Sequence, residues 1–157
     1  MGAIAPVTLR AATPADAEAI RDLLHRSQLP TADLATSQPE FMVACERERI
    51  IGAGALERFG DSALLRSVAV ETPWRGSGVG RLIVAELERR ARTAGVIEVI
   101  LLTTTARDFF ERLGYGSKDR AQVSPAVLNS EEFRSLCPAA AVCMAKRISI
   151  AAKTARS

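Results

Sequence analysis

Residues 74–80, WRGSGVG, constrain this chain more than any other stretch, because three glycines fall within five positions. They follow an apolar run, ALLRSVAV (63–70), and lead into an amphipathic run, VGRLIVAELERRARTAG (79–95). The pattern predicts a strand, a glycine turn and a helix. The first N–H groups of a helix have no internal partner and attract anions, and glycine lacks the Cβ that would keep a phosphate at a distance. The stretch therefore predicts a phosphate-binding loop, with a tight turn of no further function as the alternative.

The spacing of the glycines excludes two common phosphate loops. The nucleoside-triphosphate loop needs a lysine after its last glycine, and residues 74–80 contain none. The dinucleotide fingerprint GxGxxG needs one more residue than separates Gly76, Gly78 and Gly80. The spacing that remains is Arg-x-x-Gly-x-Gly, carried by Arg75, Gly78 and Gly80.

The elements around this loop predict a mixed α/β fold. Strands are expected over 7–10, 41–45, 50–59, 63–70, 96–104, 115–123 and 140–148, and helices over 13–26, 79–95, 106–114 and 129–136. Residues 27–39 are broken by prolines and predict a loop with one short helical turn. Consecutive strands before the loop favour a mostly antiparallel sheet of six or seven strands flanked by helices.

Length and composition fit one domain. The chain has 157 residues and a formal charge of +3, which is too small to indicate nucleic-acid binding. No apolar run reaches the length of a membrane span, and the N-terminus does not resemble a signal peptide. Three cysteines, an odd number, favour reduced thiols and a cytoplasmic location. We expect a domain over 1–148 and a basic tail over 149–157.

The chain resembles the GNAT N-acetyltransferase superfamily, in which an Arg-x-x-Gly-x-Gly loop binds the pyrophosphate of acetyl-coenzyme A. In this resemblance the loop lies between strand 4 and the following helix. A second segment also matches the superfamily pattern, at Thr103, Ala106, Phe109, Phe110, Gly114 and Tyr115. Four stretches, GALERFG, LLRSVAV, LLTTTARDFFERLGY and SLCPAAAVCM, are similar to the arsenic-resistance branch of these enzymes, whose relatives acetylate arsinothricin or phosphinothricin.

The resemblance implies acetyl-CoA as the acetyl donor and no metal. A backbone N–H near Val68 would polarise the thioester carbonyl, and the strand edge at 68–70 would pair with the pantetheine arm. The residues that the resemblance assigns to the cofactor are Val68, Ala69, Val70, Arg75, Gly76, Ser77, Gly78, Val79, Gly80, Arg81, Thr103, Phe109 and Phe110.

The acid–base residues are less clearly marked. An amine must lose a proton before it attacks, and many relatives use a glutamate on the strand before the loop. That strand has no acidic residue here, so Glu57 is the expected base, with Glu71 and His25 as alternatives. Phe110 occupies the position where relatives carry a tyrosine acid, and a phenyl ring donates no proton.

Substrate recognition is expected from Arg66, a charge within an apolar strand. Arg66 either pairs with Glu57 or grips a substrate carboxylate bidentately. Ser67, Thr104 and Glu57 are further candidates for contact with the substrate.

The predicted function is acetyl transfer to the primary amine of a small molecule, with a glutamate-like toxin as the favoured substrate and a homodimer as the implied assembly. The alternative is an acetyl-CoA-binding module of weak or no activity, in which Cys45, Cys137 and Cys143 sense arsenite.

Overall fold

The computed structural model of the chain describes residues 6–136 and 141–149, and its strands form one sheet. The strands are β1 (Val7–Ala11), β2 (Glu40–Glu46), β3 (Arg49–Phe59), β4 (Ser62–Val70), β5 (Glu98–Thr103), β6 (Gly116–Ser117) and β7 (Val142–Arg147). Their spatial order is β1-β2-β3-β4-β5-β7-β6, and only the β4–β5 neighbours are parallel. The predicted mixed α/β class with a mostly antiparallel sheet is therefore confirmed.

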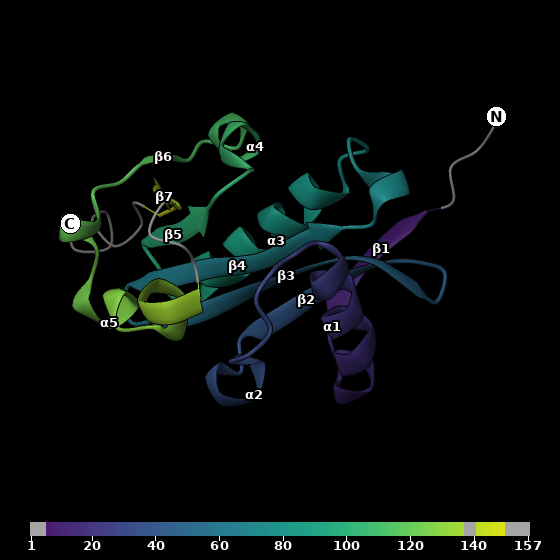
Figure 1. The fold of residues 1–157 in the computed structure, drawn as a ribbon. Coiled ribbons are helices and arrows are strands. Elements are labelled where there is room, and N and C mark those ends of the chain that lie inside the picture. The colour runs from purple at the N-terminus through teal and green to yellow at the C-terminus, as the bar shows by residue number, and fades with distance from the viewer. Residues whose placement is uncertain (1–5, 137–140, 150–157) are drawn as a thin grey trace.

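Helices cover both faces of this sheet (Figure 1). They are α1 (Ala17–Arg26), α2 (Leu34–Ser37), α3 (Val79–Thr93), α4 (Arg107–Arg112) and α5 (Pro125–Leu128). The long helix α3 packs on one face through Ile83 and Leu87, while α1 packs on the other through Leu23 and Leu24. The short helix expected within 27–39 is α2.

Two glycines of β3 allow α3 to lie close to the sheet. A Cβ built on Gly54 would stand 2.6 Å from Ile83 Cγ2 and 3.1 Å from Leu87 Cδ1, and one on Gly52 would stand 2.9 Å from Ile83 Cδ1. Both distances to Ile83 are shorter than real Cβ contacts. The position of α3, and with it the position of the loop at its N-terminus, therefore depends on the absence of a side chain at Gly52 and Gly54.

Gly54→Ala is expected to lower the free energy of unfolding by about 1–3 kcal/mol, because an added methyl group overpacks the interface with α3. Urea denaturation measures the effect. Gly116→Ala is the matched control, since no atom lies within 4 Å of its added Cβ. A Gly54→Ala protein as stable as the wild type would contradict the prediction, because α3 could then move away from the sheet without any loss of stability.

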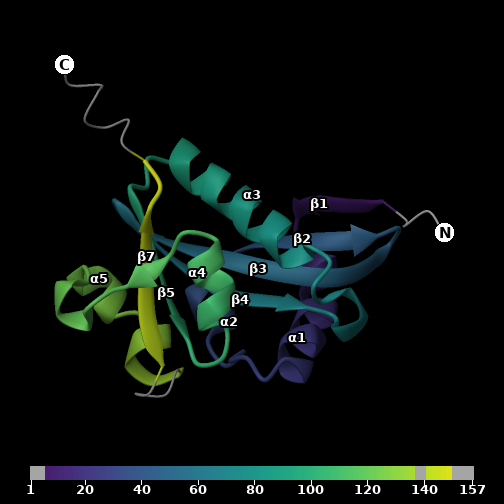
Figure 2. The ribbon, with the colours of Figure 1, turned by 90° about the horizontal axis from the view of Figure 1, so that it is seen from above.

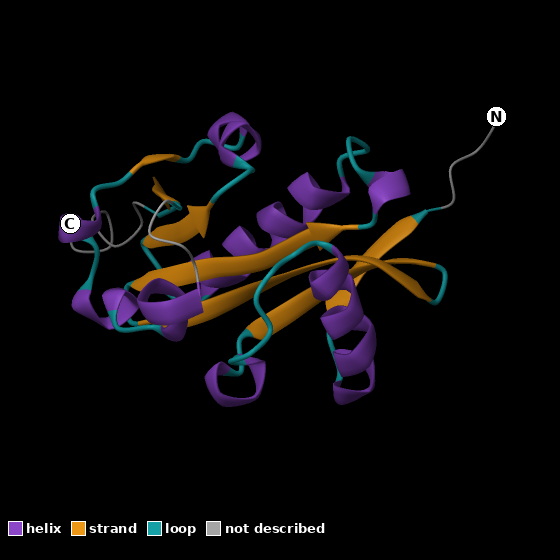
Figure 3. Cartoon of the chain, viewed as in Figure 1, coloured by secondary structure: helices purple, strands orange, loops and turns teal. Residues whose placement is uncertain are grey.

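The sequence prediction was wrong over most of 115–123. Only Gly116–Ser117 is a strand, and a 3₁₀ turn follows at Arg120–Gln122 (Figure 3). The reason is the side chain of Asp119, whose Oδ1 accepts a hydrogen bond from the Ala121 N–H at 2.9 Å and turns the chain. The expected helix at 129–136 is a π-helical turn, Glu132–Leu136.

Candidate functional site

The candidate site begins where β4 and β5 part. Their parallel pairing joins Ser62, Ala63 and Leu64 to Glu98, Val99 and Ile100. Beyond these pairs the two strands separate from each other. β4 stays paired with β3 as far as Val70 and β5 with β7 as far as Thr103, and a cavity of about 1050 Å³ is lined by both strands. In Figure 2, β5 and β7 run at a steep angle to β2, β3 and β4. We call this space the cleft.

A bulge in β4 shapes the wall of the cleft. Ala53 pairs with Ala69 and Ala55 pairs with Arg66, so Ser67 and Val68 stand opposite a single residue of β3. Ser67 has a φ of 59°, in the left-handed region. A bulge of this kind bends a strand and redirects its backbone. Of the predicted positions, Val68 belongs to the bulge and Ala69 and Val70 follow it, and all three line the cleft.

The glycine loop leads directly into α3. Gly78 is the N-cap residue of α3 with a φ of 95°, and Gly76 has a φ of 80°. Most side chains rarely adopt this conformation. No atom lies within 4 Å of a Cβ built on either glycine, so the loop leaves open space in front of the helix N-terminus. A helix N-terminus that faces such open space favours an anion.

A second cavity, of about 460 Å³, lies at this loop and shares the end of β4 with the cleft. Arg75 lines both cavities, and its Nε donates to the Val70 carbonyl at 3.0 Å. Ser77 donates its hydroxyl to the Trp74 carbonyl, and Val79 is buried beneath the loop. The predicted cofactor residues that line one or both cavities are Val68, Ala69, Val70, Arg75, Gly76, Gly78, Gly80, Arg81, Thr103, Phe109 and Phe110.

The segment after β5 closes the other side of the cleft. Thr103 Oγ1 accepts a hydrogen bond from the Ala106 N–H at 2.9 Å, and Thr104 lines the cleft beside it. The rings of Phe109 and Phe110 meet edge to face with their centroids 4.9 Å apart. Phe110 lines both cavities, so this wall presents a phenyl ring where the superfamily pattern has tyrosine.

Tyr115 lies away from the cleft, in the core. Its hydroxyl donates to Glu88 Oε2 at 2.8 Å, and Lys146 Nζ contacts the same carboxylate at 3.0 Å. Burial, together with the Glu88 charge, raises the pKa of Tyr115. The hydroxyl therefore stays protonated and joins the segment after α4 to α3, while Lys146 joins β7 to the same carboxylate.

The side chain of Arg66 is fully buried among three carboxylates. Its two terminal nitrogens donate to Asp33 at 2.6 and 2.7 Å, and Nη1 also donates to Glu57 at 3.0 Å. Glu132 Oε1 lies 3.6 Å from Nε. Of the two roles that the sequence left open for Arg66, the pairing with Glu57 is the arrangement observed.

Asp33 and Glu132 are the members of this cluster that sequence reasoning missed. Burial opposes the charge of Asp33, but the hydrogen bonds from Arg66 and Ser37 and the positive charge of Arg66 together outweigh it, so the pKa of Asp33 is lowered. Asp33 precedes α2 in the proline-broken segment, and Glu132 begins the π-helical turn. A charged residue inside an apolar strand was the one sequence signal that such partners were needed.

The three residues expected as bases occupy different places. The Glu57 carboxylate is held by Arg66, and Glu57 is not among the described residues that line the cleft. Glu71 forms an ion pair with Arg26 near the end of β4. His25 is exposed, and its Nε2 lies 3.0 Å from Thr31 Oγ1. Neither Glu71 nor His25 lines the cleft.

The cysteines are separated in the core. Cys45 and Cys143 are buried free thiols in different hydrophobic clusters, and Cys137 lies outside the described residues. Burial raises the pKa of Cys143. Within 6–136 and 141–149, no three histidine, cysteine or acidic side chains are grouped to hold a metal ion.

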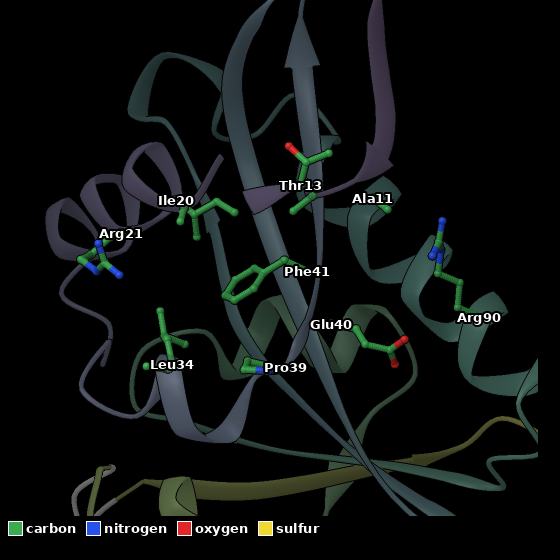
Figure 4. A pocket seen from close by; sticks show the side chains of 12 residues that line it. Ala11, Thr13, Ile20, Arg21, Leu34, Pro39, Glu40, Phe41 and Arg90 are labelled. Atoms are coloured by element: carbon green, nitrogen blue, oxygen red, sulfur yellow. The ribbon is translucent and has the colours of Figure 1, made fainter. Parts of the chain in front are cut away.

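Another groove, of about 490 Å³, lies between α1, α2 and the start of β2. Figure 4 shows Ile20, Leu34 and Phe41 gathered around it. Its lining includes none of the residues predicted for cofactor or substrate. In the described part of the chain, no helix is long and apolar enough to cross a membrane.

Comparisons with known proteins agree with this geometry. The family model described as acetyltransferase (GNAT) domain matches residues 37–116, which include the bulge, the loop and α4. The uncharacterized N-acetyltransferase CT2212 of Chlorobaculum tepidum is 38% identical over 77 residues, which are 48% of this chain and 49% of that protein. The match therefore spans about half the length of this curated relative.

Two solved structures illustrate the shared fold. N-acetylglutamate synthase from Neisseria gonorrhoeae, complexed with coenzyme A and N-acetyl-glutamate, has a TM-score of 0.80 at 19% identity, over 94% of this chain and 36% of that one. Rv2747 from Mycobacterium tuberculosis, in complex with CoA and a second ligand, has a TM-score of 0.75 at 26% identity, over 89% of this chain and 98% of that one.

Proposed function

The chain belongs to the GNAT acetyltransferase family, and on that premise we propose that it transfers an acetyl group from acetyl-CoA to the primary amine of a small molecule. One observation carries the proposal: the end of β4, Val68–Val70, lines both the cleft and the cavity at the glycine loop. A ligand with an anionic end at the loop can therefore reach the parting of the strands along one continuous wall.

The residues have distinct tasks in this reaction. The N-terminus of α3 and the loop before it hold the pyrophosphate, with Arg75 and Arg81 as cations at its sides. Acetyl-CoA, when bound, supplies a thioester whose carbonyl carbon the amine attacks. A backbone N–H in 68–70 polarises that carbonyl. Phe110 has no proton to give, so the thiolate leaves without help from this side chain, as its modest basicity permits.

We further propose that the acceptor is a glutamate-like amino acid, a class that includes phosphinothricin and arsinothricin. The similar fold of a synthase complexed with N-acetyl-glutamate supports this class. The cleft has two arginines besides Arg66, namely Arg26 and Arg75. Because Arg66 already donates to Asp33 and Glu57, and Arg75 is assigned to the pyrophosphate, we assign recognition of a substrate carboxylate to Arg26, which also pairs with Glu71. A homodimer and a cytoplasmic location also remain proposals.

Thiol release from acetyl-CoA tests the function. With a panel of amino acids, phosphinothricin, arsinothricin and polyamines, we expect amine-dependent release that is highest for amines carrying acidic groups, because Arg26, Arg66 and Arg75 line the cleft. Omission of the amine gives the hydrolysis background. If calorimetry shows CoA binding but no amine raises release, the chain is the inactive binding module instead.

A further inference from the structure

We propose that Glu132 is the residue that removes the proton from the acceptor amine, an inference that rests on the acetyl transfer proposed above. Among the described residues that line the cleft, Glu132 has the one carboxylate, and none is a histidine, cysteine or tyrosine. Its side chain is 6% exposed. A base must share the space in which the amine meets the thioester, and Glu132 meets that condition where Glu57 does not.

The location of Glu132 also fits the reacting atoms. Its Oε1 lies 3.6 Å from Arg66 Nε, and the same nitrogen donates to Ser67 Oγ at 3.3 Å. Val68 is the next residue of the bulge, and a backbone N–H in 68–70 is the group proposed to polarise the thioester carbonyl. The carboxylate therefore lies on the same stretch of wall as the backbone that positions the acetyl group.

The charges around Glu132 favour both an ammonium group and the uptake of a proton. Three carboxylates face one guanidinium, so negative charge is in excess. Asp33 on the segment before α2 takes both terminal nitrogens of Arg66, and Glu57 on β3 takes one of them. The Glu132 ion pair is the longest of the three. Glu132 is thus the carboxylate that the guanidinium holds least closely.

The step balances without any further reactant. The ammonium group gives one proton to the Glu132 carboxylate and becomes a free amine. Its nitrogen forms a bond to the acetyl carbonyl carbon, and the C–S bond breaks. The second nitrogen proton ends on the departing thiolate, through water, and Glu132 returns its proton to solvent. The products are an amide and a free thiol.

Glu132→Gln tests the role, with the amine that gives the highest release in the panel. We expect kcat/KM at pH 7 to fall about 100-fold, as is usual when a general base is removed. The CoA affinity and the melting temperature should stay near the wild-type values. The lost rate should return as pH rises, because more of the amine is then free without a base.

Glu131→Gln is the matched control, since Glu131 is the adjacent residue, is exposed and does not line the cleft. Its rate should equal that of the wild type. Glu57→Gln is the rival test. The inference is overturned if Glu132→Gln changes the rate less than about 3-fold, or if Glu57→Gln alone removes the acidic limb of the pH profile. A pH-independent loss accompanied by weaker CoA binding would also overturn it, because that pattern marks a structural role.

Failure of the proposed function would give a different experimental result. In that case the wild type releases no thiol above the hydrolysis background with any amine, whereas every outcome that overturns the present inference leaves an active wild type.

Discussion

Gly78→Asp is expected to abolish CoA binding. Gly78 is the N-cap residue of α3 with a φ of 95°, and its position faces open space in front of the loop. An aspartate there would bring a negative charge to the point where the helix N-terminus holds the pyrophosphate, and it would also strain the backbone. We expect a loss of at least about 100-fold in affinity, measured by isothermal calorimetry with CoA.

Two variants separate charge from strain in this experiment. Gly78→Ala adds the strain without the charge and should retain part of the affinity. Gly60→Asp places the same side chain at another glycine of positive φ, 66°, in the turn between β3 and β4, also with no atom within 4 Å. It should bind CoA like the wild type. Unchanged affinity in Gly78→Asp would show that the pyrophosphate binds elsewhere.

Arg66→Ala is expected to destabilise the fold by about 3–5 kcal/mol, because it leaves buried carboxylates without their cation. Asp33, Glu57 and Glu132 would then face one another with side-chain exposures of 3%, 11% and 6%. Arg58→Ala is the control: Arg58 pairs with Glu40 at the surface, where both side chains are about half exposed, and should cost less than about 1 kcal/mol. Urea denaturation compares the two.

The loss of stability in Arg66→Ala is expected to depend on pH in a definite direction. In the wild type, burial raises the pKa of Asp33, but the hydrogen bonds from Arg66 and Ser37 and the charge of Arg66 together lower it by more, so the net shift of the pKa is downward. The stability from that shift is complete above the pKa of the unfolded chain and is lost as pH falls through the folded value. In the Arg66→Ala variant, burial and mutual repulsion instead favour the protonated form of the carboxylates. The difference in the free energy of unfolding between the wild type and the variant should therefore become smaller from pH 7 toward about pH 4. A difference that stays constant with pH would point to lost packing rather than to charge.

The sequence predicted the parts of this site that local rules determine. The glycines of residues 74–80 require a backbone that few other residues adopt, and the apolar period after them requires a helix, so a short window sufficed. The alternation of strands and turns before the loop predicted the antiparallel half of the sheet in the same way.

The surroundings of Arg66 could not be predicted, because its partners are distant in the sequence. Asp33 is 33 residues before it, in a segment without a periodic pattern, and Glu132 comes from a turn after β6. Only the folded sheet and the connections over its face bring them together. An arginine in an apolar strand indicates that it needs partners, but it does not indicate which carboxylates supply them.

The parting of β4 and β5 also affects how the protein avoids aggregation. A strand whose N–H and C=O groups lack a neighbour is a template on which strands of other chains can add. Most sheets carry such edges at their rims, where they need charges or prolines for protection. Here the edge of β4 that faces β5 beyond Leu64 lies inside the sheet and lines the cleft together with residues 26–30 and 103–106, while its other edge stays paired with β3. The hydrogen-bonding groups of this edge therefore face the cleft and not the rim of the sheet, where strands of other chains add.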